Sequence, residues 1–102
     1  MVTIQRFTSV SNGMGGYIEE WVHLMDYDGV VDQLSGNEKV IANQLSPTST
    51  HVLIGPYVEG IIEQDRVIFN NKVYEVKNVD DPMNMHRHLE ILLEYKGVLQ
   101  DA

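Results

Sequence analysis

The sequence contains no cysteine among its 102 residues, which excludes disulfide bonds, thiolate metal sites and cysteine nucleophiles. Basic residues are scarce, with seven Lys and Arg against 15 Asp and Glu, and the formal charge is −8. A groove that grips nucleic acid needs clustered Lys and Arg, so this balance argues against one. It permits a surface past which DNA slides without binding, because like charges repel.

Long hydrophobic runs are also missing. The longest, such as Val52–Ile54 and Ile91–Leu93, are too short to cross a bilayer. The first eight residues show no basic region followed by an apolar stretch, so no signal peptide is predicted and the default expectation is a soluble cytoplasmic product. With 43% hydrophobic and 22% charged residues, the composition is that of a globular protein, and we expect one domain spanning residues 1–102.

Short segments rich in β-branched and aromatic residues, separated by turn residues, predict a mainly β fold. The last of them alternates apolar and polar positions, which predicts that Leu89, Ile91, Leu93 and Tyr95 face the core. Six or seven strands at this spacing, with one short helix, predict a small antiparallel β-barrel or sandwich. The expected strands are Thr3–Val10, Tyr17–Asp26, Val30–Val31, His51–Ile54, Arg66–Phe69, Lys72–Lys77 and His86–Tyr95.

Three local features refine this picture. The segment Asn37–Leu45 is the one predicted helix, because Asn37 can cap it and apolar residues recur at helical spacing. Asn70–Asn71 predicts a tight hairpin, since Asn tolerates positive φ. Trp21 is expected to anchor the core, whereas an exposed Trp would indicate an interface.

Motifs for catalysis are weak throughout the chain. Gly13–Gly16 is the only glycine-rich loop, but an acidic strand follows it where a phosphate loop needs Lys and Ser or Thr, so a hairpin loop is favoured. Asp80–Asp81 lacks the further oxygen ligands of a calcium loop. No serine lies in a nucleophile elbow. We therefore predict no catalytic residue, no cofactor and no enzymatic activity.

A metal site is the one specific chemical alternative. His86, His88 and Glu90 sit at i, i+2 and i+4, so one face of a strand would present two imidazoles and a carboxylate to zinc or nickel. His23 or His51 would supply a further ligand. The same spacing arises on any solvated strand face, and this plainer interpretation is favoured. A metal-dependent enzyme or sensor therefore stays a rival hypothesis.

The order of motifs in the second half resembles the head–tail adaptor, or head-completion, family of tailed bacteriophages and prophages. Individually the motifs are short, and their order and spacing carry the resemblance, which covers about Trp21 to Tyr95. The first half agrees more loosely, through Trp21 and a segment with Gly36, Glu38 and Ala42. The matching segments are Thr50–Ile54, Asp65–Phe69, Val73–Pro82 and Arg87–Leu92, and the motif residues are His51, Asp65, Arg66, Tyr74, Asp80, Arg87 and Glu90.

The resemblance implies a small β-barrel protein of the virion neck, made in the bacterial cytoplasm, with no membrane partner. It implies a ring, commonly twelvefold, that lies between an adaptor ring on the portal and a tail-completion or tail protein. Double-stranded DNA would pass through the lumen without sequence-specific binding. In the stopper branch a long mobile loop before the His strand projects into the channel. Here that loop would include Leu34, Ser35, Gly36, Asn37, Glu38, Lys39, Gln44, Ser46, Thr48 and Ser49.

One departure from the family pattern stands out. Relatives often carry an Arg-Tyr pair after the His strand, where this chain has Gly55-Pro56-Tyr57, so an arginine contact between ring subunits at that point is not expected. Two further functions stay open beside the ring. One is a tail-completion protein of the same neck region. The other is a monomeric β-barrel that binds a protein or peptide.

Overall fold

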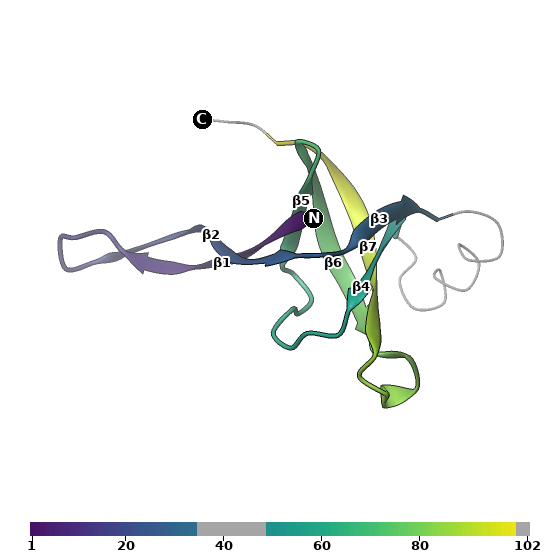
Figure 1. Ribbon diagram of the computed structural model, residues 1–102. Helices are drawn as coiled ribbons and strands as arrows, with labels where there is room; N and C mark the ends of the chain where they lie inside the picture. The colour runs from purple at the N-terminus through teal and green to yellow at the C-terminus, as the bar shows by residue number, and fades with distance from the viewer. Residues whose placement is uncertain (35–48, 100–102) are drawn as a thin grey trace.

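The computed structural model of the chain describes residues 1–34 and 49–99, and they form one antiparallel sheet of seven strands (Figure 1). The order of the strands across the sheet is β2-β1-β5-β6-β7-β4-β3. The strands are β1 (Val2–Ser11), β2 (Tyr17–Tyr27), β3 (Val30–Gln33), β4 (His51–Pro56), β5 (Arg66–Phe69), β6 (Lys72–Asp80) and β7 (His88–Val98).

The predicted mainly β class is confirmed, and each expected strand is present. β5 has the predicted bounds, whereas the other strands begin or end at different residues. The tight turn at Asn70–Asn71 is also confirmed, with φ of 50° and 62° at the two residues. The predicted helix Asn37–Leu45 lies outside the described residues. Within residues 1–34 and 49–99 the only helix is the short 3-10 turn η1 (Pro82–Asn84). No helix there has the length and apolar character needed to span a membrane.

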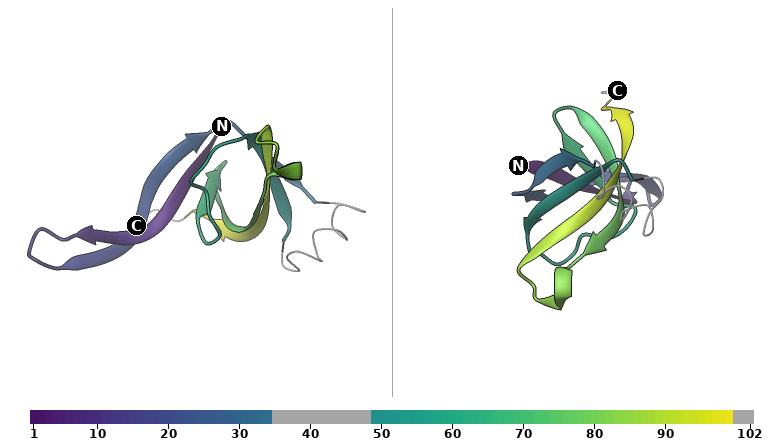
Figure 2. Two further views of the ribbon diagram at one scale, coloured as in Figure 1. Left: turned by 90° about the horizontal axis from the view of Figure 1, so that it is seen from below. Right: turned by 90° about the vertical axis from the view of Figure 1, so that its right-hand side faces the viewer.

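The sheet curls strongly but does not close, which corrects the predicted barrel (Figure 2). Its edge strands, β2 and β3, do not pair with each other. The reason lies in β1, which pairs with β2 over its whole length but with β5 only through Thr3, Ile4 and Gln5. Beyond Gln5 the β1–β2 hairpin leaves the body of the sheet, so most of β2 is carried away from β3.

The hydrophobic core fills the inside of the curl. Leu89, Ile91 and Leu93 are buried as their alternation predicts. The prediction was wrong for Tyr95, which is 40% exposed near the C-terminal end of β7, where burial falls off. Strands β1, β2, β4, β5 and β6 and the segment before β5 contribute the other core residues, which are Val2, Ile4, Tyr27, Leu53, Ile61, Val67, Tyr74 and Val76. A smaller apolar cluster combines Leu34, Val52 and Leu92.

Tyr27 explains why β4 continues through Gly55-Pro56, beyond the predicted end of this strand at Ile54. Its buried hydroxyl donates a hydrogen bond of 2.6 Å to the carbonyl oxygen of Pro56. A Cβ atom at Gly55 would lie 2.7 Å from the Tyr27 ring, so only glycine fits there. Burial raises the pKa of Tyr27 to about 12, because the buried phenolate would lose hydration.

This arrangement predicts a loss of stability at alkaline pH. Because the pKa of Tyr27 is raised by folding, its contribution is complete below the ordinary tyrosine pKa near 10 and is lost as the pH rises to about 12. The free energy of unfolding of the wild type, measured by urea titration, should fall across this window. Tyr27→Phe should lower stability at pH 8 but flatten the alkaline slope. Parallel slopes for the two proteins would contradict the assignment.

Candidate functional site

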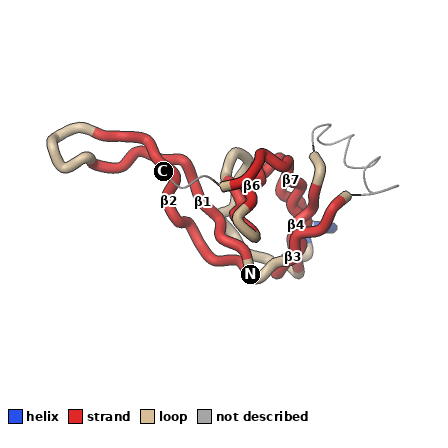
Figure 3. The backbone as a smooth tube through the Cα atoms, turned by 90° about the horizontal axis from the view of Figure 1, so that it is seen from above, coloured by secondary structure: helices blue, strands red, loops and turns tan. Residues whose placement is uncertain are grey.

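The β1–β2 hairpin extends from the body as an arm, which we define as residues 6–22 (Figures 1 and 3). The arm portion of β1, Arg6–Ser11, spans roughly 20 Å at about 3.4 Å per residue. Large apolar side chains along it face solvent, and an isolated two-stranded ribbon is only marginally stable in water. Exposed apolar surface of this kind marks an interaction site. The residues are Phe7 (52% exposed), Met14 (88%), Tyr17 (76%) and Ile18 (49%).

The tip of the arm is an organised turn, in agreement with the favoured hairpin interpretation of its glycines. The side-chain oxygen of Asn12 accepts hydrogen bonds from the amides of Met14, at 2.8 Å, and Gly16, at 3.2 Å. Gly13 and Gly15 have φ of 78° and 82°, a region that strongly favours glycine. Since Asn12 occupies these two amides, they are not free to hold a phosphate.

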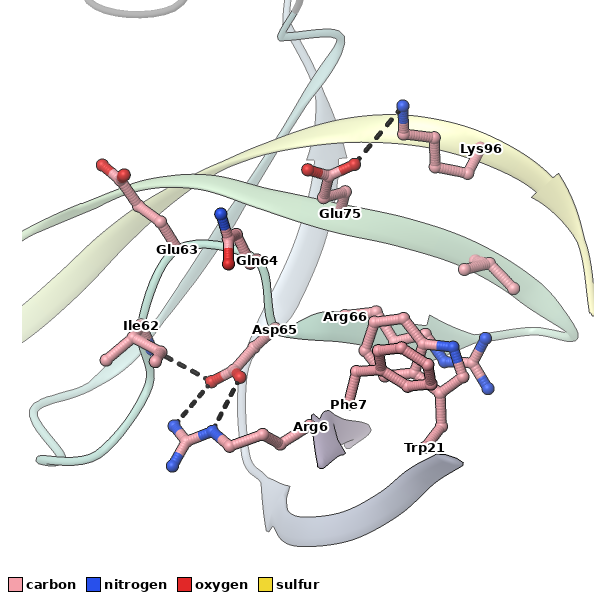
Figure 4. A pocket seen from close by; sticks show the side chains of 11 residues that line it. Arg6, Phe7, Trp21, Ile62, Glu63, Gln64, Asp65, Arg66, Glu75 and Lys96 are labelled. Carbon is pink, nitrogen blue, oxygen red and sulfur yellow. Dashed lines mark hydrogen bonds and ion pairs between the residues drawn. The ribbon is translucent and has the colours of Figure 1, made fainter. Parts of the chain in front are cut away.

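An ion pair fixes the base of the arm to the body. The guanidinium of Arg6 on β1 donates from Nε to Oδ1 and from Nη2 to Oδ2 of Asp65, both at 2.9 Å (Figure 4). Oδ2 also accepts the amide of Ile62 at 3.0 Å, and Arg6 bonds the carbonyl oxygen of Gly60. Asp65 is 1% exposed, so these partners, and not water, stabilise its negative charge. The hydrogen bond to Asp65 raises the pKa of Arg6 above the ordinary arginine value.

A groove opens beside this ion pair, in the angle between the arm and β5–β6 (Figure 4). Phe7 and Trp21 pair across the arm with ring centroids 5.2 Å apart, and the Arg66 guanidinium lies 4.3 Å from the Trp21 ring centroid. Trp21 therefore does not anchor the core as predicted; it is partly exposed on the arm. The groove has a volume of about 530 Å³ and is also lined by Ile62, Glu63, Gln64, Val73, Glu75 and Lys96.

Arg66 has an unusual electrostatic position in this groove. Its Nε donates to the side-chain oxygen of Gln5 at 2.6 Å, and it makes no ion pair with any described residue. Burial without a carboxylate partner lowers its pKa, because the cation loses hydration. Its neighbour Lys96, in contrast, pairs with Glu75 at 3.3 Å and Glu94 at 3.1 Å. The groove thus offers an apolar wall and one guanidinium without a counter-charge.

Lys96 belongs to a ring of four alternating charges on β6 and β7. Lys77 pairs with the same two carboxylates, at 3.2 Å to Glu75 and 3.3 Å to Glu94. These four charges cancel locally, and the hydrogen bonds to the carboxylates raise the pKa of both lysines. The net negative charge of the chain must therefore come from acidic residues elsewhere.

The three hypothetical metal ligands do not share one strand face, because His86 lies outside β7. His86 precedes β7 with a φ of 55°, and its Nδ1 lies 2.6 Å from Asp81 Oδ2. Its ring packs against Tyr57 with centroids 4.4 Å apart and the ring planes tilted by 42°. His88 instead lies 3.2 Å from Glu90. In the part of the chain that the structure describes, no group of three or more His, Asp or Glu is arranged to hold a metal ion.

The motif residues that carried the family resemblance lie in several separate parts of the sheet. His51 packs edge-on to Tyr74, with ring centroids 5.0 Å apart, and its Nδ1 bonds the Thr50 hydroxyl at 2.8 Å. Burial lowers the pKa of His51, which favours the neutral ring. Asp65 and Arg66 lie at the arm base, in the groove described above.

The other predicted positions lie elsewhere. Asp80 pairs in register with Glu90 where β6 meets β7, and Arg87 is exposed just before β7. Of the predicted loop only its ends are described, and Leu34 and Ser49 are both buried. The other eight loop residues lie outside the described residues.

Two comparisons with known proteins bear on this arrangement. Residues 1–96 match the family described as phage head completion protein. The chain belongs to this family. It is similar to the Head completion protein gp16 of Bacillus phage SPP1, with 30% identity over 91 residues that cover 89% of this chain and 82% of the relative. The resemblance inferred from the motifs is therefore confirmed, and the chain is a structural head completion protein of the phage head–tail junction.

For this head completion protein, loss of the Arg6–Asp65 ion pair should be costly. Asp65→Asn leaves the guanidinium facing a neutral amide and should lower the free energy of unfolding by about 2–3 kcal/mol, since breaking a buried pair from one side is strongly destabilising. Glu63→Gln, at an exposed acid two residues away, is the matched control and should change it by less than about 0.5 kcal/mol. Equal losses in thermal or urea unfolding would contradict a specific role of the pair.

Proposed function

We propose that this chain assembles as a ring at the head–tail connector and joins the DNA-filled capsid to the tail.

 The observation that carries this proposal is the arm. In a lone copy Phe7, Met14 and Tyr17 face water, and beyond Gln5 the ribbon has no strand neighbour on either side among the described residues. Membership of the head completion family also supports a role at the head–tail connector. A repeated subunit contact would cover this surface and give the arm a partner.

The charge of the chain supports a channel through which DNA moves. A formal charge of −8 on each copy would repel the phosphates of DNA, and this repulsion acts over a Debye length of about 8 Å at physiological salt. In a ring the charges of all copies add around one lumen. DNA would therefore pass without adhering to the wall, and closure of the channel would need a physical obstruction.

The stopper role and the neighbours in the neck belong to the same proposal. The ring, commonly twelvefold in the family, would contact an adaptor protein on the portal side and a tail-completion or tail protein on the other. The channel segment from Leu34 to Ser49 stays a prediction, because residues 35–48 lie outside the described ranges. The dodecameric number is likewise an expectation from the family.

Deletion of the reading frame in the source phage or prophage tests the proposal by electron microscopy of the particles. We expect separate heads and free tails, with joined virions restored when the wild-type protein is supplied. Heads that have also lost their DNA would support the stopper role. Complete heads beside defective tails would favour a tail-completion protein, and normal virions would contradict a role in the neck and favour the monomeric binding module.

A further inference from the structure

We infer that the arm of one copy docks into the groove at the arm base of the next copy, with Tyr17 against the Phe7–Trp21 wall and Glu19 on Arg66. The inference rests on the proposed function, since it names the contact that would build the ring. It commits to a second copy of this chain as the occupant of the groove. Three observations lead to it.

The first observation is that one face of the arm combines apolar surface with an unpaired carboxylate. Side chains alternate along β2, so Tyr17 and Glu19 share a face, while Ile18 and Glu20 lie on the opposite face. Tyr17 and Glu19 are exposed, and Glu19 makes no ion pair within the described chain. This face therefore presents a phenol ring and a carboxylate about 7 Å apart along the strand.

The second observation is that the groove offers the complementary chemistry. Phe7 and Trp21 form an apolar wall, and Ile62 also lines the groove. Arg66 lies against Trp21 and makes no ion pair with a carboxylate among the described residues. A guanidinium that is partly buried gains more from a carboxylate than an exposed one does, because water screens the pair less. In a chain with 15 acids and seven bases, this cation is a specific place for an acid from outside.

The third observation is that the tip of the arm cannot reach the apolar wall of its own groove. Ten residue pairs hold β1 and β2 together from Val2↔Tyr27 to Ser11↔Tyr17. Phe7 and Trp21 line the groove at the base of this ribbon, and Tyr17 lies four residues from Trp21 along β2, roughly 14 Å away on the same face. The Tyr17 ring therefore reaches a Phe7–Trp21 wall only in another molecule. Such a contact is head-to-tail, and it ends only when copies close into a ring.

Because the sequence contains no cysteine, introduced thiols can be cross-linked without background reaction, and this allows a direct test. Ser11→Cys places a thiol opposite Tyr17 on the docking face of the arm, and Ile62→Cys places one in the groove. Particles from the deletion strain, supplied with the double variant, are treated with a short bis-maleimide and separated by denaturing electrophoresis. We expect a ladder of covalently linked copies that extends beyond the dimer.

Three controls fix the direction of the contact. When Ser11→Cys chains and Ile62→Cys chains are supplied together as two single variants, they should give cross-linked dimers but nothing larger. Ser11→Cys chains alone should give no dimer. The matched control Thr8→Cys with Ile62→Cys puts the arm thiol on the opposite face and should give a much weaker ladder. Joined particles that contain the double variant but show no ladder, or an equal ladder in this control, would overturn the inference.

Charge reversal gives a second readout without cysteine. Arg66→Glu should lower the yield of joined particles by about tenfold or more, because it places a carboxylate against Glu19. Glu19→Arg on a separate chain, supplied together with the Arg66→Glu chain, should restore most of the yield, because the two changes then meet only between copies. Glu20→Arg, on the opposite face and supplied in the same way, should not. Equal rescue by the two changes, or none by Glu19→Arg, would overturn the inference. Joined particles that lack the protein altogether would instead overturn the proposed function.

Discussion

The ion pair between Arg6 and Asp65 is the constraint on which the arm and the groove both depend. It lies where β1 leaves the sheet, and it links that strand to the segment before β5 through two charged hydrogen bonds. The carboxylate also accepts the amide of Ile62, so the same group shapes one wall of the groove. Removing a buried charge from water is expensive, and this geometry satisfies both carboxylate oxygens. The arm direction and the groove therefore arise from one contact.

Much of the fold could be predicted from the sequence, because its signals are local. Alternation in β7 identified Leu89, Ile91 and Leu93 as core residues, and Asn70–Asn71 marked a turn whose positive φ values asparagine tolerates. Whether the sheet closes into a barrel could not be predicted in this way. Whether β2 meets β3 depends on the short register between β1 and β5, and no strand pattern in the sequence reports how long a non-local pairing is.

The candidate site was harder to find for a related reason. Trp21 looked like a core residue, because an aromatic side chain in a strand normally is buried. Only the departure of the arm from the body exposes it, and that departure is a tertiary feature. Arg6, Phe7 and Gln5 carried no motif and were missed as site residues. The Asp65-Arg66 pair was noted, but its two charges act differently, one in a buried pair and one beside Trp21.

Because β1 pairs with β5 over only three residues, the arm can also move relative to the body of the sheet. Beyond Gln5 no strand bonds tie β1 to β5, so past the side-chain contacts of Arg6 and Trp21 at the base a small change of backbone angle swings the outer ribbon while the core stays intact. Over an outer ribbon of roughly 14 Å, a rotation of 10° moves the tip by about 2 Å. A hinge of this kind lets identical chains adjust to the curvature of the surface on which they assemble.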